Sequence, residues 1–100
     1  MTVYIDDMQV YARVGRVSAR WSHLTADTKE ELHAFAAQLG LKRNWFQDKP
    51  RGLWHYDVTD SKREQAIRLG AEQIEYGNLD DHVRVWRRPG REGVKSDAQL

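Results

Sequence analysis

Apolar and polar positions alternate in three parts of the chain, and this period of two is the pattern of β-strands. These parts are residues 2–6, 10–24 and 53–58. In the first, Val3 and Ile5 share one face. The second is divided at Gly15, where glycine at the first turn position suits a two-residue hairpin because it accepts a positive φ. We therefore expect three extended regions, the second of which is a hairpin.

Two segments between and after these regions have the spacing of capped helices. Thr28 precedes Glu31 by three residues, and Ser61 precedes Glu64 by the same interval, so each pair forms a capping box. Apolar residues follow at helical spacing, and each segment closes on a Leu-Gly pair that is typical of a helix end. The pattern predicts that Thr28 and Ser61 are the two N-caps.

Strands that alternate with helices are typical of α/β folds, in which crossovers join parallel strands. Two further extended pieces, about 72–76 and 82–87, are expected to complete the sheet. We expect a single small α/β domain over residues 1–88, with a mixed, mainly parallel sheet and two flanking helices. Residues 89–100 contain Pro, Gly and charge but little apolar periodicity, so we expect a flexible basic tail.

The composition agrees with one soluble domain. A chain of 100 residues can form one hydrophobic core, and 40% of its residues are hydrophobic while 31% are charged. No stretch approaches the roughly 20 apolar residues of a membrane span. Asp6 and Asp7 come too early for a signal peptide, so we expect a cytoplasmic protein that contacts no membrane. The chain has no cysteine, and any metal would be held by imidazole and carboxylate.

The charge is uneven along the chain. Residues 82–100 hold five Lys/Arg and two Asp/Glu, whereas residues 1–81 hold 11 and 13. This basic end is able to contact phosphate backbones, although short basic ends are more often only solvated. Among the four tryptophans, alternation favours a core position for Trp21 and Trp54. Trp86, next to arginines, is the candidate for stacking on a base.

Several short motifs, in their order and spacing, carry a resemblance to a known family. They are Thr2-Val3-Tyr4-Ile5-Asp6-Asp7, Trp21-Ser22-His23-Leu24, Ala26-Asp27-Thr28, Glu31-Leu32-His33-Ala34-Phe35-Ala36, Leu39-Gly40, Arg43, Trp45-Phe46-Gln47, His55-Tyr56-Asp57-Val58, Ser61-Lys62-Arg63 and Gly70-Ala71. Over residues 2–76 the chain resembles the bacterial and phage family called domain of unknown function 4031. Members of that family look like small stand-alone proteins or appendages beside hydrolase-type domains. The resemblance implies the fold unit and not a reaction.

The candidate site consists of polar residues at the ends of the predicted strands. Asp6 ends the first, His23 lies near the end of the second, and His55 with Asp57 occupies one face of the third. Because ligands of parallel sheets bind outside the carboxyl ends of the strands, we expect these four residues to converge at one edge. Imidazole paired with carboxylate can transfer protons or bind a divalent metal. The catalytic candidates are therefore His55, Asp57, His23 and Asp6.

A second group of candidates would bind an anion. The start of the second predicted helix has free backbone N–H groups beside basic side chains, which favours a phosphate or a carboxylate. The ligand-binding candidates are Ser61, Lys62, Arg63 and Arg43. A structural role competes with these assignments, because a strand-end aspartate is often a cap and a neighbouring histidine is often only hydrogen-bonded. For His55 and Asp57 together, the chemical and structural interpretations are equally supported.

Two functions from different classes follow. The first is a small enzyme-like domain that acts on, or binds, a phosphate-bearing ligand such as a nucleotide or a nucleic-acid end, with a divalent metal as the candidate cofactor. The second is a non-catalytic phage or bacterial accessory module that binds a host protein or nucleic acid through residues 84–91. A site with an ion would favour the first, and a hydrogen-bonded rim with an exposed apolar patch elsewhere would favour the second.

Overall fold

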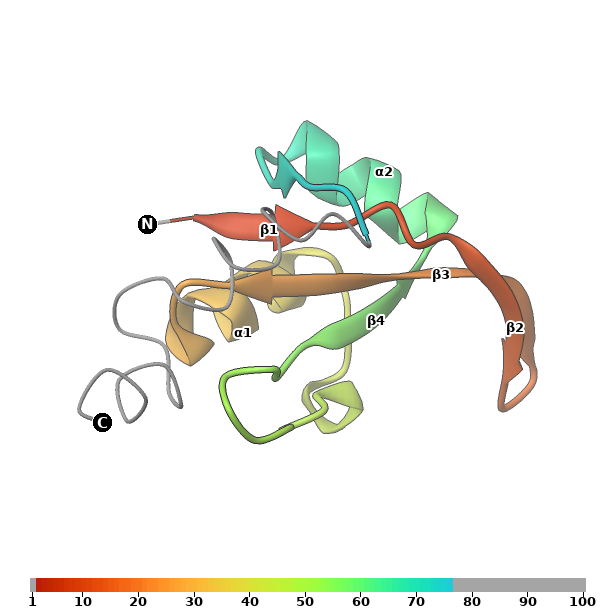
Figure 1. Ribbon diagram of the computed structural model, residues 1–100, viewed down its shortest axis with the longest axis horizontal. Coiled ribbons are helices and arrows are strands. Elements are labelled where there is room, and N and C mark those ends of the chain that lie inside the picture. Colours follow the sequence, from red (N-terminus) through yellow and green to blue (C-terminus); the bar gives the residue numbers. More distant parts are fainter. Residues whose placement is uncertain (1, 77–100) are drawn as a thin grey trace.

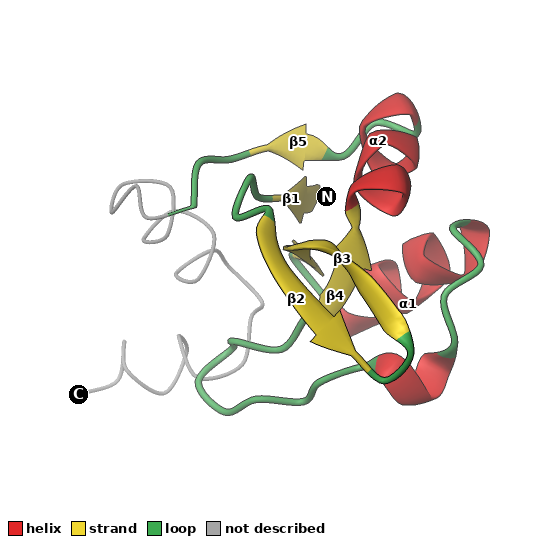
Figure 2. Ribbon diagram, turned by 90° about the vertical axis from the view of Figure 1, so that its right-hand side faces the viewer, coloured by secondary structure: helices red, strands yellow, loops and turns green. Residues whose placement is uncertain are grey.

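The computed structural model describes residues 2–76, which form a five-stranded sheet and two α-helices (Figure 1). Both helices lie on the same side of the sheet (Figure 2). The elements in chain order are β1 (Val3–Ile5), β2 (Val10–Val14), β3 (Val17–Ala26), α1 (Lys29–Gln38), the 3-10 helix η1 (Arg43–Trp45), β4 (Tyr56–Thr59), α2 (Asp60–Arg68) and β5 (Glu72–Gln73).

The sheet is mixed but mainly antiparallel, so the expectation of a mainly parallel sheet is wrong. The strand order is β2-β3-β1-β5, with β4 on the other edge of β3, and only β1 and β5 pair in parallel among the described residues. β3 is the return strand of a hairpin, which makes it antiparallel to β2. After α1 the chain returns to the end of β3 that it left, where Tyr56 faces Leu24, and it then runs back along β3. A helix between two strands therefore does not make them parallel here.

The hairpin is confirmed. Val14 pairs with Val17 across a two-residue turn, and Gly15 has a φ of +62°, which a residue with a side chain rarely adopts. β3 extends ten residues to Ala26, two residues beyond Leu24, where we expected it to end. Among the described residues, 17–20 pair only with β2, and the two strands form an arm that projects from the rest of the molecule (Figure 1).

The core lies between the sheet and the two helices. Alternate residues of β3, such as Leu24 and Ala26, are fully buried on the side that faces the helices. α1 contributes Leu32 to this core, and α2 contributes Ala66. His23 and Thr25 take the intervening positions on β3 and therefore face away from the helices. The period of two thus divides the sheet into a core face and an open face.

One of the two predicted helix caps is correct. The Thr28 hydroxyl accepts a hydrogen bond from the backbone N–H of Glu31 at 3.1 Å, as the capping box requires. The second cap is Thr59, whose hydroxyl accepts from the N–H of Lys62 at 3.3 Å, and Ser61 lies inside the first turn of α2. The prediction for Ser61 is wrong because β4 leads directly into α2, so the last extended residue of the strand already has a side chain that can cap the helix.

Several expectations concern the part of the chain outside the described residues. The extended piece at 82–87, Trp86, the basic surface at 84–91 and the tail at 89–100 all lie there. The expected extended piece at 72–76 corresponds to β5. Within residues 2–76, neither helix has the length and apolar character that crossing a membrane requires.

Candidate metal centre

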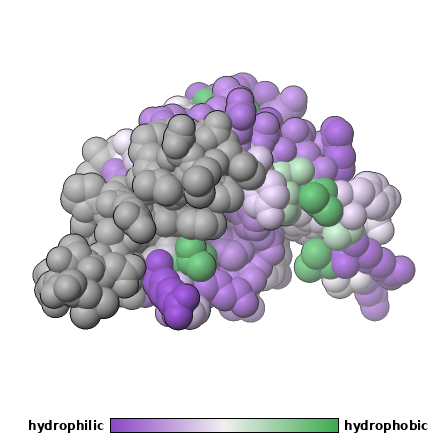
Figure 3. Space-filling view, in the orientation of Figure 1, coloured by the Kyte–Doolittle hydropathy of each residue, from purple (hydrophilic) through white to green (hydrophobic). Residues whose placement is uncertain are grey.

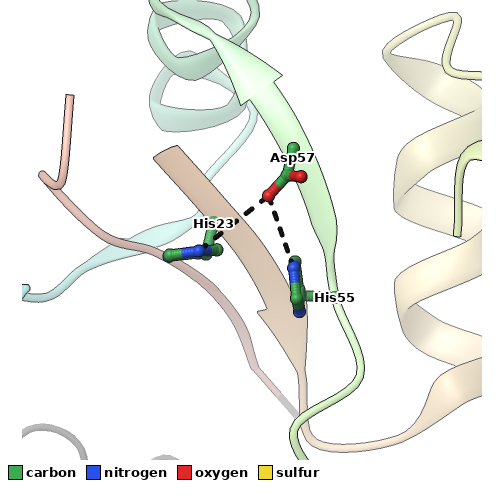
Figure 4. Close-up of side chains that lie close together, drawn as sticks. All are labelled: His23, His55 and Asp57. Atoms are coloured by element: carbon green, nitrogen blue, oxygen red, sulfur yellow. Dashed lines mark ion pairs between the residues drawn. The ribbon is translucent and has the colours of Figure 1, made fainter. Parts of the chain in front are cut away.

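The side chains of Asp6, His23, His55 and Asp57 come together on the open face of the sheet (Figure 4 shows the last three). His23 and Asp57 are direct partners in the register of β3 and β4. The rings of His23 and His55 meet edge to face with centroids 4.8 Å apart. The antiparallel pairing of β3 and β4 places His23 opposite Asp57, and His55 directly precedes β4. Asp6 follows β1, which also pairs antiparallel with β3, so the convergence does not come from parallel strands that end at a common carboxyl edge.

Asp6 holds His23 in one orientation. The carboxylate is only 5% exposed, and its Oδ2 accepts from Nδ1 of His23 at 2.7 Å. Its Oδ1 accepts from two backbone N–H groups, those of His23 at 2.9 Å and Met8 at 3.2 Å. Since a carboxylate accepts hydrogen bonds, the proton of the neutral imidazole lies on Nδ1. The lone pair of His23 is therefore on Nε2.

His55 is held in the same tautomer by a different partner. Its Nδ1 lies 2.9 Å from the backbone carbonyl of Leu53, and a carbonyl can only accept, so Nδ1 carries the proton. Its Nε2 lies 3.3 Å from Oδ1 of Asp57. The same carboxylate oxygen is 3.9 Å from Nε2 of His23. When both imidazoles are neutral, two lone pairs and one carboxylate oxygen therefore face a common point.

The other oxygen of Asp57 is held by a residue that the sequence did not identify as part of the site. Nε2 of Gln47 donates to Oδ2 of Asp57. Gln47 is placed by two backbone hydrogen bonds with His55, at 2.9 and 3.1 Å, which form an isolated bridge beside β4. A single bridge across a loop leaves no periodic pattern in the sequence, although Gln47 belongs to one of the short motifs that carry the family resemblance.

The protonation of His23 and Asp57 follows from their mutual contacts. Burial lowers the pKa of His23, but the hydrogen bond to Asp6 and the charges of Asp6 and Asp57 outweigh this effect, so its pKa lies above the ordinary 6.5. Burial raises the pKa of Asp57, but the hydrogen bond and charge of His55, the charge of His23 and the hydrogen bond from Gln47 lower it below 3.8 overall. Both pKa shifts indicate that a positive charge beside Asp57 is favourable.

The distances suit a metal ion. His23, His55 and Asp57 each offer one ligand atom, and these atoms lie within 4.8 Å of one another. Ligands about 2.0–2.1 Å from a tetrahedral Zn²⁺ are roughly 3.4 Å apart, so small side-chain rotations would bring all three into place. Two imidazoles and one carboxylate form a ligand set typical of zinc and of non-haem iron, with positions left open for water or substrate.

The cluster lies between two pockets. His23 and His55 line a pocket of about 380 Å³ that also contains Lys49 and Tyr76, whose ring is 5.7 Å from that of His23. Asp57 lines a second pocket, of about 450 Å³, on the side of the β2–β3 hairpin. A ligand bound at the three facing atoms therefore has room on both sides.

The predicted anion-binding residues are only partly associated with the centre. Nε of Arg63 donates to the backbone carbonyl of Asp6 at 2.8 Å, so it fixes the turn that carries this carboxylate. Nζ of Lys62 donates to the carbonyl of Leu39 at 2.6 Å and lines the second pocket. Ser61 and Arg43 are exposed and make no hydrogen bond or ion pair with the four clustered residues. The start of α2 therefore helps to position Asp6 through the hydrogen bond of Arg63.

The described residues form a small α/β domain with a cluster of two histidines and one aspartate, and each of these three side chains is held by a further hydrogen bond. The chain belongs to the family described as Protein of unknown function (DUF4031), whose family model matches residues 3–87. That match includes every residue of the centre. Searches of the curated proteins and of the solved structures found no match.

Proposed function

We propose that this domain binds a divalent transition-metal ion between His23, His55 and Asp57 and uses it to bind and hydrolyse a phosphate ester of a nucleotide or a nucleic-acid end. One observation carries the proposal. Both Nδ1 atoms donate to fixed acceptors, so both Nε2 lone pairs face Oδ1 of Asp57. Three electron-pair donors that face one point favour a cation between them, either a proton or a metal ion.

The distances favour a metal ion over a proton on one of the imidazoles as that cation. A charge-assisted N–H···O⁻ bond is about 2.7–2.9 Å long. Oδ1 of Asp57 lies 3.3 Å from one imidazole and 3.9 Å from the other, which is too far for two such bonds. The shorter bond of this kind, 2.7 Å, is on the opposite side of His23, with Asp6. Carboxylate–histidine pairs of this type orient metal ligands in many proteins.

The pocket chemistry supports a phosphate ester as the ligand. Three protein ligands leave coordination positions for water and for a phosphate oxygen, and a bound metal lowers the pKa of such a water towards neutrality. Lys49 lines the same pocket as His23 and His55 and supplies a positive charge for the phosphate. Ions that prefer imidazole, such as Zn²⁺, fit this ligand set better than Mg²⁺ or Ca²⁺.

Calorimetric titration of metal-free protein with Zn²⁺, and with Co²⁺ followed by its visible absorption, tests the metal centre. We expect one ion per chain, and loss of binding in His55→Ala and His23→Ala. His33→Gln is the matched control, because this histidine lies on α1 and bonds to the hydroxyl of Tyr56 instead of the cluster. Zn²⁺-dependent hydrolysis of bis(p-nitrophenyl) phosphate, lost in the same variants, tests the reaction. Equal metal binding by His55→Ala and the wild type would contradict the proposal.

A specific observation also favours the non-catalytic binding module. Val10, Val14 and Val17 are each about half exposed on the projecting hairpin, where they form an apolar surface (Figure 3). Size-exclusion chromatography with light scattering detects a complex with such a partner and so distinguishes the two functions. A module of this kind would bind a partner through the hairpin with no dependence on metal, and His55→Ala would leave that binding unchanged.

A further inference from the structure

The second pocket is built mainly from aromatic and apolar side chains. The hairpin supplies Val14, Val17 and Trp21, η1 supplies Trp45, and Lys62 closes one side. Trp21 is fixed by a hydrogen bond from its Nε1 to the carbonyl of Ala12 at 2.9 Å. Trp45 is 49% exposed, and therefore offers a large part of its ring to a ligand.

Two of the three segments that line this pocket are basic, and the third contributes both Asp57 and Lys62. Residues 8–26 and 32–47 contain no aspartate or glutamate, whereas the whole chain has 15 acidic residues and a net charge of only +1. Their basic residues are Arg13, Arg16, Arg20, Lys42 and Arg43. Nζ of Lys42 lies 5.7 Å from the ring centre of Trp45, and Arg20 pairs with Asp60. Lys42 beside the Trp45 ring and Lys62 in the pocket lining favour an anionic ligand.

The pocket borders the metal centre. Asp57 lines it, and Oδ1 of the same residue faces His23 and His55, which line the first pocket. A ligand that extends from one pocket to the other therefore passes the three facing atoms.

We propose that the pocket between Trp21 and Trp45 binds a base of single-stranded nucleic acid, whose backbone crosses Asp57 and places a phosphate at the metal centre. This inference rests on the proposed function for the identity of the reacting group. Flat apolar rings flanked by cations are the usual surface for single-stranded nucleic acid, because every base can stack on an aromatic ring and every phosphate is attracted to the cations. The next nucleotide would enter the pocket that contains Lys49.

A single strand fits this arrangement better than a duplex or a protein partner. Bases in a duplex are stacked on one another, so their faces are not available to a tryptophan ring. An apolar segment of another protein would gain nothing from Lys62 in the pocket lining or from Lys42 beside Trp45. The volume of about 450 Å³ accommodates one unstacked base with its sugar.

Fluorescence anisotropy of a short fluorescein-labelled DNA or RNA strand, in EDTA and at low salt, tests the subsite independently of the metal. We expect Trp45→Ala to weaken binding by about tenfold or more. Arg16→Gln should weaken it with a smaller dependence on salt. The matched control is Tyr11→Ala, because Tyr11 is 72% exposed on the opposite face of the same hairpin and should not contact the strand. Circular dichroism confirms that each variant is folded.

Each outcome decides the inference. A loss confined to Trp45→Ala and Arg16→Gln, with weaker binding of the duplex, supports it. No binding at low salt, equal loss in Tyr11→Ala, equal affinity for the duplex, or a Trp45-dependent dimer of the chain would overturn it. Because the strand titration is carried out in EDTA, its result is independent of the Zn²⁺ titration. Failure of zinc binding alone would therefore remove the proposed function, and failure of strand binding alone would remove the subsite.

Discussion

His23 and Asp57 occupy directly opposed positions on β3 and β4, and Oδ1 of Asp57 lies 3.9 Å from Nε2 of His23. Neither residue depends on a loop for its position, because both belong to the hydrogen-bonded ladder of the sheet. The backbone of His55, directly before β4, is held by the bridge to Gln47, and its ring is held by the hydrogen bond to the carbonyl of Leu53. A centre built on regular strands is rigid, which favours a metal with defined geometry.

Asp6→Asn should weaken zinc binding by about 10–100-fold, because the asparagine amide no longer fixes Nδ1–H of His23 by a charged hydrogen bond. Calorimetric titration measures this change. Asp7→Asn serves as the control, since Asp7 is exposed and accepts a hydrogen bond from the backbone of Tyr76. The role of Asp6 in orienting His23 would be contradicted if both variants bound zinc equally well.

Rising pH should lower the stability of the metal-free protein and raise its affinity for zinc. The pKa of His23 lies above 6.5, so the folded state holds this proton more tightly than the unfolded chain does. Its contribution to the free energy of unfolding is therefore complete below pH 6.5 and is lost as the pH rises through the raised pKa. Zinc needs the deprotonated Nε2, so zinc affinity should increase over the same interval.

Thermal unfolding in EDTA and in excess Zn²⁺, across about pH 5 to 8, measures both trends. His23→Gln is the reference, because the slope that belongs to this residue is the difference between the variant and the wild type. If the slopes in EDTA were identical, His23 would have no raised pKa in the folded state.

Thr59→Ala should lower the free energy of unfolding by about 0.5–2 kcal/mol, because the first turn of α2 loses its side-chain acceptor. Ser61→Ala, inside the same helix, should change it by less than about 0.5 kcal/mol. Urea unfolding of the two variants tests the assignment of the cap. A larger loss in Ser61→Ala would restore the sequence-based prediction.

Leu32→Ala should cost about 2–5 kcal/mol, because this side chain is fully buried between α1 and the sheet and its truncation leaves a cavity. Leu69→Ala is the matched control, since the Leu69 side chain is 49% exposed at the end of α2. The same urea experiment compares them. Similar losses would show that α1 does not form the main core contact.

The family of the chain was predictable from the sequence, because several short motifs keep their order and spacing, and the family match covers residues 3–87. The hairpin at Gly15 and the cap at Thr28 were predictable as well. Each depends on chemistry within a few residues, namely a positive φ in a turn and a hydroxyl three residues before a glutamate.

The relative direction of β3 and β4 was not predictable from such local chemistry. The reason why the four clustered residues converge was therefore not predictable either. The alternation of polar and apolar residues predicted that His55 and Asp57 share a face, because the period of two is local to one strand. Whether β4 runs along β3 or against it depends on the path of residues 39–55, and no local pattern encodes that path. Gln47 was missed for the same reason.

The sequence by itself therefore determined the family, the amphipathic segments, the hairpin turn, one of the caps, and the face that His55 and Asp57 share, since all of these follow from residues that are neighbours in the chain. The tertiary structure alone decided that β4 pairs antiparallel with β3, that His23 faces Asp57, that Asp6 and Leu53 fix the two imidazoles, and that Trp45 borders a pocket beside them. These relationships join residues that are distant in the chain, and the free energy that selects them comes from burial of the common core and not from any single segment.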